Sequence, residues 1–232
     1  MILASNPSYT VAENEPTAKK VLIIDDHPVF RRGIAALIGE QRDLSVCGEA
    51  ENALEGLEAV RQLKPDVALI DISMPGTNGI ELIKMILAED PKMLILVLSM
   101  HDESLYALRA LRAGAKGYIM KGEVLSNVIT ALRKVLNKDI YISQRFNERL
   151  IFDTIHTQGG VCNSPVEKLS DREVEVLQWI GKGHSTRQIA HSLHLSVKTI
   201  ETHRAHIKEK LGFKDSAEMI RFATEWVTEE LA

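Results

Sequence analysis

The chain is predicted to consist of an α/β domain followed by a small all-helical domain. Between residues 20 and 138, short apolar runs alternate five times with longer amphipathic stretches, a pattern typical of a parallel sheet covered by helices on both faces. Beyond Leu169 no strand pattern occurs, and four helical segments follow one another, each with its own start signal. With 232 residues, the chain is long enough for two domains of ordinary size.

The elements of the first domain are indicated by their apolar patterns. Five short runs of mainly aliphatic residues predict strands over 21–24, 44–49, 67–70, 94–98 and 118–120. The first helix begins after Pro28, because Phe30, Ile34 and Ile38 recur on one helical face. Pro65 closes the second helix before the third strand begins. The predicted helices cover 28–39, 53–63, the stretch from Ile80 to Leu87, 103–113 and 124–136.

The helices of the second domain are marked by residues that cap helix N-termini. Ser170-x-x-Glu173 is a capping box, and Leu169 and Val174 flank it as a hydrophobic staple. The three later start signals are Ser185-x-x-Gln188, Ser196 and Asp215-x-x-Glu218. Residues 141–166 contain a predicted helix over 146–155 and a Gly-, Asn- and Ser-rich stretch, so we expect them to link the two domains.

Composition limits the class of protein. Hydrophobic residues make up 45% of the chain and charged residues 26%, as in soluble globular proteins. The net charge of −4 excludes a uniformly basic coat for nucleic acid. No apolar run is long enough to span a membrane, and residues 1–19 are predicted to be a disordered polar tail rather than a secretory signal. Two cysteines are too few for a disulfide framework, so we expect a cytoplasmic protein without a membrane partner.

Polar and charged residues stand where four of the predicted strands end. Asp25-Asp26, Asp71, Ser99 and Lys121 follow or end the apolar runs. Because ligands of an open parallel sheet bind outside the carboxyl ends of its strands, these residues should meet in one crevice. Three carboxylates suit Mg²⁺, while a hydroxyl and an ammonium suit phosphoryl oxygens. The sequence therefore predicts a site that accepts a phosphoryl group on a carboxylate.

These segments resemble those of a two-component receiver domain. They are Asp25-Asp26-His27-Pro28, Asp71-Ile72-Ser73-Met74-Pro75-Gly76, Ser99-Met100-His101-Asp102 and Gly117-Tyr118-Ile119-Met120-Lys121. The resemblance implies a flavodoxin-like, doubly wound sheet of five parallel strands in the order 2-1-3-4-5. It also implies that a sensor histidine kinase phosphorylates Asp71.

The resemblance further implies a role for each residue of the site. Asp26, Asp71 and the main-chain carbonyl of Ser73 would hold Mg²⁺, and Asp25 would act largely through water. Ser99 and Tyr118 would be the switch pair, and Lys121 would contact the phosphate. Two positions depart from the common pattern: Ser99 replaces Thr but keeps a hydroxyl, and Gly122 stands where many receivers have Pro.

The second domain is interpreted as a helix-turn-helix. Its second helix covers 185–193, its turn 194–196 and its third helix 197–211, and residues 168–214 carry nine Lys and Arg against five acids. In the third helix, Ile200 and Ile207 face the core, whereas Lys198 and Thr202 face away. The expected DNA contacts are Lys198, Thr199, Glu201, Thr202, His203, Arg204, Ala205 and Lys208. By itself, such a helix would more often be a plain amphipathic helix with a solvated face.

Three further segments resemble a LuxR-type DNA-binding domain. They are residues 169–177, 183–190 and 196–203, and together with the receiver they make the chain from Lys20 onward similar to a NarL/FixJ-family response regulator. The resemblance implies a receiver over 20–140, a linker over 141–166 and a DNA-binding domain over 167–232. It also implies promoter DNA as partner, a homodimer after phosphorylation paired through the helix over 216–227, and RNA polymerase as a candidate partner.

The sequence leaves one alternative function open and disfavours two kinds of enzyme. A DNA-binding protein controlled by a partner, with a vestigial acidic site, is the alternative, although the complete set of acceptor residues argues against it. We do not expect an enzyme: an aspartate-dependent phosphatase would need Asp where Ser73 stands, and a nicotinamide site would need a glycine-rich loop after the first strand. His191 and His194 have a spacing that can bind zinc, but no Cys pair accompanies them.

Overall fold

A computed structural model describes residues 18–100, 103–156 and 165–230. Most of the predicted tail over 1–19 lies outside the described residues. The first part of the chain forms a parallel sheet in the order β2-β1-β3-β4-β5. Its strands are β1 (Lys19–Ile24), β2 (Leu44–Ala50), β3 (Val67–Asp71), β4 (Leu94–Ser99) and β5 (Gly117–Met120). This order and direction confirm the predicted flavodoxin-like sheet.

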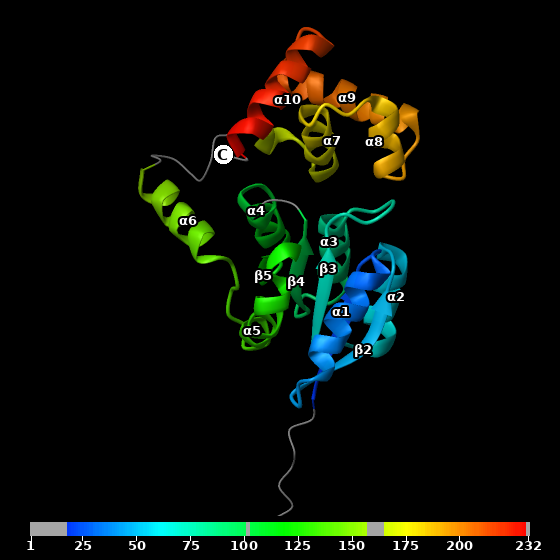
Figure 1. Ribbon diagram of the computed structural model, residues 1–232, viewed down its shortest axis with the longest axis vertical. Coiled ribbons are helices and arrows are strands. Elements are labelled where there is room, and N and C mark those ends of the chain that lie inside the picture. The colour runs from blue at the N-terminus through cyan, green and yellow to red at the C-terminus, as the bar shows by residue number, and fades with distance from the viewer. Residues whose placement is uncertain (1–17, 101–102, 157–164, 231–232) are drawn as a thin grey trace, which may run out of the picture.

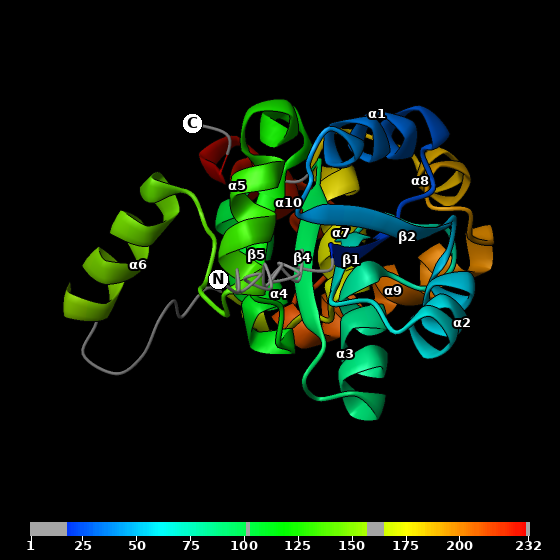
Figure 2. The same cartoon turned by 90° about the horizontal axis from the view of Figure 1, so that it is seen from below.

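Five helices cover the two faces of this sheet. Figure 2 shows α1 and α5 on one face and α2, α3 and α4 on the other. The helices are α1 (Pro28–Gly39), α2 (Ala53–Leu63), α3 (Gly79–Glu89), α4 (Glu103–Ala113) and α5 (Val124–Leu136). The bounds of α1, α2, α4 and α5 are those predicted. Proline begins α1, and the side chain of Asn52 caps α2 by accepting from the amide of Glu55.

Alternate residues along the strands divide the interior into two apolar layers. In β1, Val21 and Ile23 pack toward α1 and α5, whereas Leu22 and Ile24 pack toward α2 and α3, as the pleat of a strand requires. All four are fully buried. The layer that contains Leu22 continues through α3 and α4 into the buried residues of the helical domain, so it joins the two domains.

Along the sequence, α6 (Gln144–His156) stands between the two domains. In space it extends away from both (Figures 1 and 2). A short 3₁₀ turn, Pro165–Lys168, then precedes the helical domain. The helix predicted over 146–155 is thus present, and α6 begins two residues earlier than that stretch.

The helical domain is built from α7 (Asp171–Gly181), α8 (Thr186–Ser192), α9 (Val197–Leu211) and α10 (Ser216–Glu230). The predicted capping boxes at Ser170 and Ser185 are both present. Gly181 lets α10 lie directly on α7, because a Cβ there would meet the carbonyl oxygen of Ala223 at 2.3 Å. Among the described helices, none is long and apolar enough to cross a membrane.

The helical domain sits at one end of the sheet, above α3 and α4 (Figure 1). This end carries the carboxyl ends of the strands, because residues just after β3, including Ser73 and Pro75, share a crevice with Leu193 and His194 of the helical domain. The second domain therefore lies beside the edge where the predicted site is expected.

Candidate functional site

Four strands bring the predicted polar residues to one edge. Asp25 directly follows β1, Asp71 ends β3, Ser99 ends β4 and Lys121 directly follows β5. These strands are neighbours in the sheet, so their carboxyl ends lie side by side. The amide of Asp25 donates to the carbonyl of Ala50 at 3.1 Å, which continues the pairing of β1 with β2 up to the site.

Lys121 lies between two buried carboxylates. Its Nζ is 2.6 Å from Oδ2 of Asp25 and 2.7 Å from Oδ2 of Asp71, and all three side chains are nearly inaccessible to solvent. Asp26, beside them, is the more accessible carboxylate, with 21% of its side chain exposed. We call Asp25, Asp26, Asp71 and Lys121 the acidic site.

His27 belongs to the same cluster, which the sequence did not indicate. Its Nδ1 is 2.7 Å from Oδ1 of Asp26 and 3.2 Å from Oδ1 of Asp25, and its amide donates to Asp25 at 2.8 Å. One ligand atom from each of the three aspartates and His27 lies within 4.8 Å of the others, a span that fits a single metal ion. Because carboxylate oxygens dominate the set, a hard divalent cation such as Mg²⁺ suits it.

Two other side chains of α1 support the acidic site. The ring of Phe30 lies 4.6 Å from Nζ of Lys121, a cation–π distance. Arg31 is buried although it is charged, and its guanidinium donates to the carbonyl of Asp25. Neither role could be read from the sequence, where Phe30 is one member of an apolar stripe and Arg31 is an ordinary helix residue.

The carboxyl of Asp71 is held in an unfavourable environment for its charge. Burial raises its pKa to about 6, and the nearby Asp25 adds to the effect, while Lys121 and the amide of Ser73 oppose it. The ionised carboxylate is therefore destabilised in the metal-free protein, which favours a cation or other positive charge at this position.

The loop after β3 is fitted closely around Asp71. The amide of Ser73 donates to Oδ1 of Asp71 at 3.2 Å. Asn78 caps α3 by accepting from the amide of Ile80 at 2.8 Å. Position 79 must be glycine, because a Cβ there would lie 2.1 Å from the carbonyl oxygen of Asp71. The main chain of this loop is thus held close to the carboxylate of Asp71.

The predicted switch residues are both buried. Ser99 is inaccessible at the end of β4, and Tyr118 points into the interior from β5 beside Tyr106 of α4. Lys121 begins a 3₁₀ turn, Lys121–Glu123, that leads into α5. Gly122 lies in that turn, and a Cβ at this position would meet open space.

In the helical domain, α9 has one buried and one exposed face. Ile200 and Ile207 are fully buried, whereas Lys198, Glu201, Thr202 and Ala205 are exposed. We call these four exposed residues the reading face. The hydroxyl of Thr202 donates to the carbonyl of Lys198, one turn earlier in α9, at 3.0 Å.

The remaining predicted DNA contacts flank the reading face. Thr199, His203, Arg204 and Lys208 are partly buried. Burial lowers the pKa of His203 and that of Arg204, because part of each side chain is covered by the rest of the domain. The N-terminus of α9 is capped by Ser196, which accepts from the amide of Thr199 at 3.0 Å.

Both parts of the chain match known families. Residues 21–133 match the response regulator receiver domain, and residues 167–223 match the bacterial regulatory proteins of the luxR family. The oxygen regulatory protein NreC of Staphylococcus carnosus (strain TM300) is 38% identical over 208 residues, which make up 88% of this chain and 96% of the relative.

Solved structures show the same likeness. The RcsB response regulator of Salmonella typhimurium, in a study of conformational dynamism for DNA interaction, has a TM-score of 0.63 at 26% identity, covering 90% of this chain and 98% of its own. RcsB from Salmonella enterica serovar Typhimurium, bound to promoter rprA in the presence of phosphomimetic BeF₃⁻, has a TM-score of 0.60 at 27% identity, covering 89% of this chain and 98% of its own.

Proposed function

Because this chain belongs to the response regulators that join a receiver domain to a LuxR-type DNA-binding domain, we propose that phosphorylation of Asp71 controls its binding to promoter DNA. As a member of that family it is a DNA-binding transcription regulator. The observation that carries the proposal is Lys121, whose Nζ lies within 2.7 Å of the buried carboxylates of Asp25 and Asp71. A fixed ammonium beside a buried carboxylate is what a phosphorylated aspartate requires.

In the proposed reaction, an oxygen of Asp71 forms a bond to phosphorus as the phosphorus–nitrogen bond of a kinase phosphohistidine breaks, and the imidazole leaves. Lys121 neutralises charge on the transferred group, and the amide of Ser73 is placed to hold the carboxylate in position. Asp26, Asp71 and the main-chain carbonyl of Ser73, with Asp25 through water, would hold Mg²⁺. When bound, that ion supplies positive charge for the phosphoryl oxygens.

The kinase is expected to dock beside this site on an apolar cleft of about 460 Å³. Its rim carries Val29, Met100 and Leu125, of which 83%, 72% and 81% are exposed, and its floor includes His27 and Lys121. Exposed apolar side chains at such density mark a surface for a partner protein. The cleft thus gives a phosphohistidine donor a route to Asp71.

The switch is proposed to start at Ser99. A hydroxyl at this position can donate to a new phosphoryl oxygen, and a shift of the β4 end would then change the space available to the buried Tyr118. The phosphoryl group brings about two negative charges, so its effect is local electrostatics acting on a packed element.

DNA is expected to be read by a homodimer. The reading face of α9 would enter the major groove, with Lys198 near phosphates, Glu201 able to accept from a cytosine amino group and Thr202 able to touch a thymine methyl. On α10, Ile220 is 44% exposed and offers an apolar side chain to a second copy. Two-fold pairing places the half-sites about one helical turn apart.

We propose a receiver domain over 20–140, a linker over 141–166 and a DNA-binding domain over 167–232. We also propose a location in the cytoplasm and contact with RNA polymerase at promoters. In this proposal the chain acts as a regulator rather than an enzyme, because the only covalent step is its own modification.

Intact-protein mass spectrometry tests the proposal. Wild type and Asp71→Asn would be exposed in parallel to acetyl phosphate with Mg²⁺. We expect one phosphoryl adduct on wild type and none on the variant. No adduct on wild type, with DNA binding intact, would favour the alternative in which a partner protein controls the chain and the acidic site is vestigial.

A further inference from the structure

His27 occupies a position where a helix-capping side chain usually stands. It is the N-cap residue of α1, yet its side chain makes no capping hydrogen bond. Pro28 begins the helix, and because a proline restricts the residue before it, His27 has extended backbone with φ of −93° and ψ of 102°. Starting α1 therefore does not account for a histidine at this position, and its ring is turned to the acidic site instead.

The ring of His27 faces three carboxylates through one nitrogen. Nδ1 lies 2.7 Å from Oδ1 of Asp26, 3.2 Å from Oδ1 of Asp25 and 3.9 Å from Oδ2 of Asp71. In a six-coordinate ion with bonds of about 2.1 Å, adjacent ligand atoms are about 3.0 Å apart and opposite ones about 4.2 Å apart. The three measured distances are close to these values, so Nδ1 stands where a further ligand atom of the same ion would stand.

One oxygen of this cluster indicates a cation. Oδ1 of Asp26 is nearly inaccessible to solvent and accepts no hydrogen bond from the residues that the structure describes, although Nδ1 of His27 lies 2.7 Å away. A buried carboxylate oxygen without a donor is costly. The close approach of an imidazole nitrogen to such an oxygen is explained if both direct a lone pair at one ion.

Lys121 and His27 contact Asp25 through different oxygens. Nζ of Lys121 is 2.6 Å from Oδ2, whereas the amide of His27 donates to Oδ1 at 2.8 Å. Lys121 thus offsets part of the negative charge without taking the oxygen that His27 faces. Because 60% of the His27 side chain is exposed, water can accept a proton bond from Nε2, and this tautomer leaves Nδ1 with its lone pair.

A nitrogen ligand changes which divalent ion the acidic site prefers. Mg²⁺ binds mainly oxygen ligands, whereas imidazole adds affinity for first-row transition-metal ions, in the order Mn²⁺, Fe²⁺, Co²⁺. We propose that Nδ1 of His27 is a metal ligand beside the carboxylates of Asp26 and Asp71, and that it shifts the preference of the acidic site away from Mg²⁺ and toward Mn²⁺ and Co²⁺. This inference rests on the proposed function in placing a divalent cation at the acidic site.

Isothermal titration calorimetry of the full chain with Mg²⁺ and with Co²⁺ tests the proposal. The variant is His27→Phe, which keeps a planar ring and removes both nitrogens, and thermal melting checks that it is folded. Asp26→Asn is the matched variant, because it removes a carboxylate from the same cluster. His191→Gln, at an exposed histidine of α8, is the control for Co²⁺ bound to another histidine.

We expect His27→Phe to weaken Co²⁺ binding about tenfold and to change Mg²⁺ binding by less than about twofold. Asp26→Asn should weaken the binding of both ions, and His191→Gln should leave both as in wild type. Unchanged Co²⁺ binding in His27→Phe would overturn the proposal. Tighter binding of both ions in that variant would also overturn it, because His27 would then be an ion-pair partner that competes with the cation.

Pulsed electron paramagnetic resonance of the Mn²⁺-loaded wild type gives a second readout that does not depend on the stability of any variant. Mn²⁺ bound to Nδ1 should show coupling to a nitrogen nucleus. This coupling should persist in His191→Gln and disappear in His27→Phe. Bound Mn²⁺ without nitrogen coupling in wild type would show that oxygen ligands alone hold the ion, and the proposal would be wrong.

The two levels of inference fail separately. If Asp26→Asn weakens the binding of both ions and His27→Phe weakens neither, a cation binds at the acidic site without His27, and the proposed function stands. If Asp26→Asn leaves the binding of both ions unchanged, the ions bind elsewhere, and the metal site of the proposed function fails together with this inference.

Discussion

The acidic site and the reading face place charged side chains in opposite environments. In the acidic site, Asp25 and Asp71 are buried, and each has a carboxylate oxygen within 2.7 Å of Nζ of Lys121. On the reading face, Lys198 and Glu201 are exposed to solvent. A site that forms a covalent bond needs its charges oriented in advance, whereas a surface that meets DNA needs them free to exchange counterions.

The difference predicts two kinds of response to mutation. Substitutions in the acidic site should change both the rate of the proposed phosphoryl transfer and the free energy of unfolding. Burying like charges close together lowers the stability of the folded protein. Substitutions on the reading face should change affinity and salt dependence but leave stability almost unchanged. The following experiments test this contrast.

Asp26→Asn should have the largest effect. Loss of one carboxylate from the proposed Mg²⁺ site should slow adduct formation from acetyl phosphate by about 100-fold, because less positive charge then faces the phosphoryl oxygens. Intact mass followed over time measures the rate. Glu40→Gln, an exposed acid at the end of α1, is the control, and an unchanged rate in Asp26→Asn would place Asp26 outside the metal site.

Asp71→Asn should stabilise the metal-free protein at pH 7 by about 3 kcal/mol, because burial raises the pKa of Asp71 from 3.8 to about 6. With a pKa higher in the folded than in the unfolded state, this carboxyl lowers stability as pH rises from about 4 to about 6. The gain should therefore vanish near pH 4, and Mg²⁺ should reduce it. Urea unfolding measures this gain in the free energy of unfolding. A variant less stable than wild type at pH 7 would contradict the conclusion that the buried charge of Asp71 lowers stability.

Lys198→Ala should weaken binding to most DNA sequences about fivefold and reduce the slope of affinity against salt by about one, with unfolding unchanged. Fluorescence anisotropy over a range of salt concentrations provides both numbers. Lys182→Ala, at the end of α7 and outside α9, serves as the control. A loss confined to one operator position would instead identify Lys198 as a base-reading residue.

Ser196→Ala should have the smallest effect, a loss of about 1 kcal/mol in the stability of the helical domain, because the amide of Thr199 loses its acceptor. Ser196→Asp should restore most of it, since an aspartate also caps a helix. If Ser196→Ala left stability unchanged but abolished DNA binding, Ser196 would act in DNA binding rather than in stabilising α9.

The sequence predicted the family, the sheet order and the strand-end positions of the site residues. Recognition as a NarL/FixJ-family response regulator is confirmed by the two family matches. The helix bounds were predictable because Pro28, Pro65 and the capping serines act locally. Asp25, Asp71 and Lys121 were expected to lie together because the carboxyl ends of parallel strands form one edge of the sheet. This holds however far apart the strands are in sequence.

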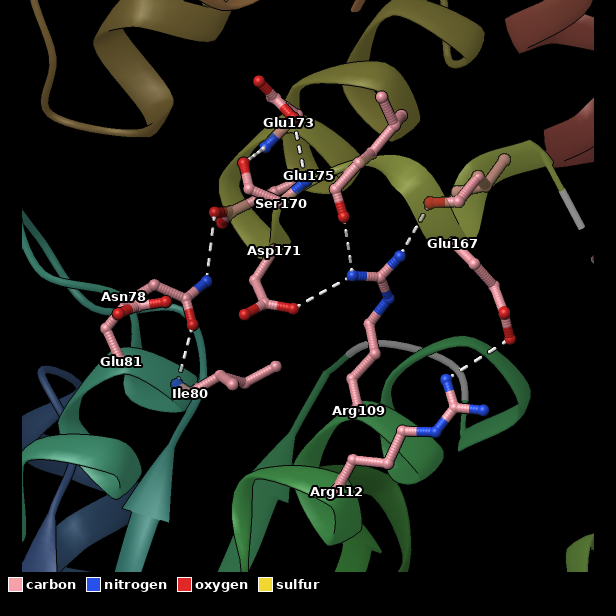
Figure 3. Close-up of polar contacts among 12 residues, drawn as sticks. Asn78, Ile80, Glu81, Arg109, Arg112, Glu167, Ser170, Asp171, Glu173 and Glu175 are labelled. Carbon is pink, nitrogen blue, oxygen red and sulfur yellow. Dashed lines mark hydrogen bonds and ion pairs between the residues drawn. The ribbon is translucent and has the colours of Figure 1, made fainter. Parts of the chain in front are cut away.

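The contact between the domains could not be predicted. Arg109 and Asp171, which form an ion pair (Figure 3), are 62 positions apart, and each stands in a stretch whose charges look like an ordinary solvated helix face. Glu173 and Glu175 of α7 are buried although both are acidic, because Lys210 and Arg172 pair with them. No sequence period or motif predicts a contact between domains, since that contact depends on how two separately folded surfaces fit together. The position of His27 was missed for a different reason: it directly follows Asp25 and Asp26, but only the local backbone turns its ring toward their carboxylates.

The apolar layer that runs from Leu22 through α4 into the helical domain has a consequence for how the protein unfolds. Domains that share one buried layer melt together, whereas domains joined only by a linker melt separately. The full chain should therefore give a single calorimetric transition, although it matches two separate family models. Two transitions would show that the shared layer does not couple the unfolding of the two domains.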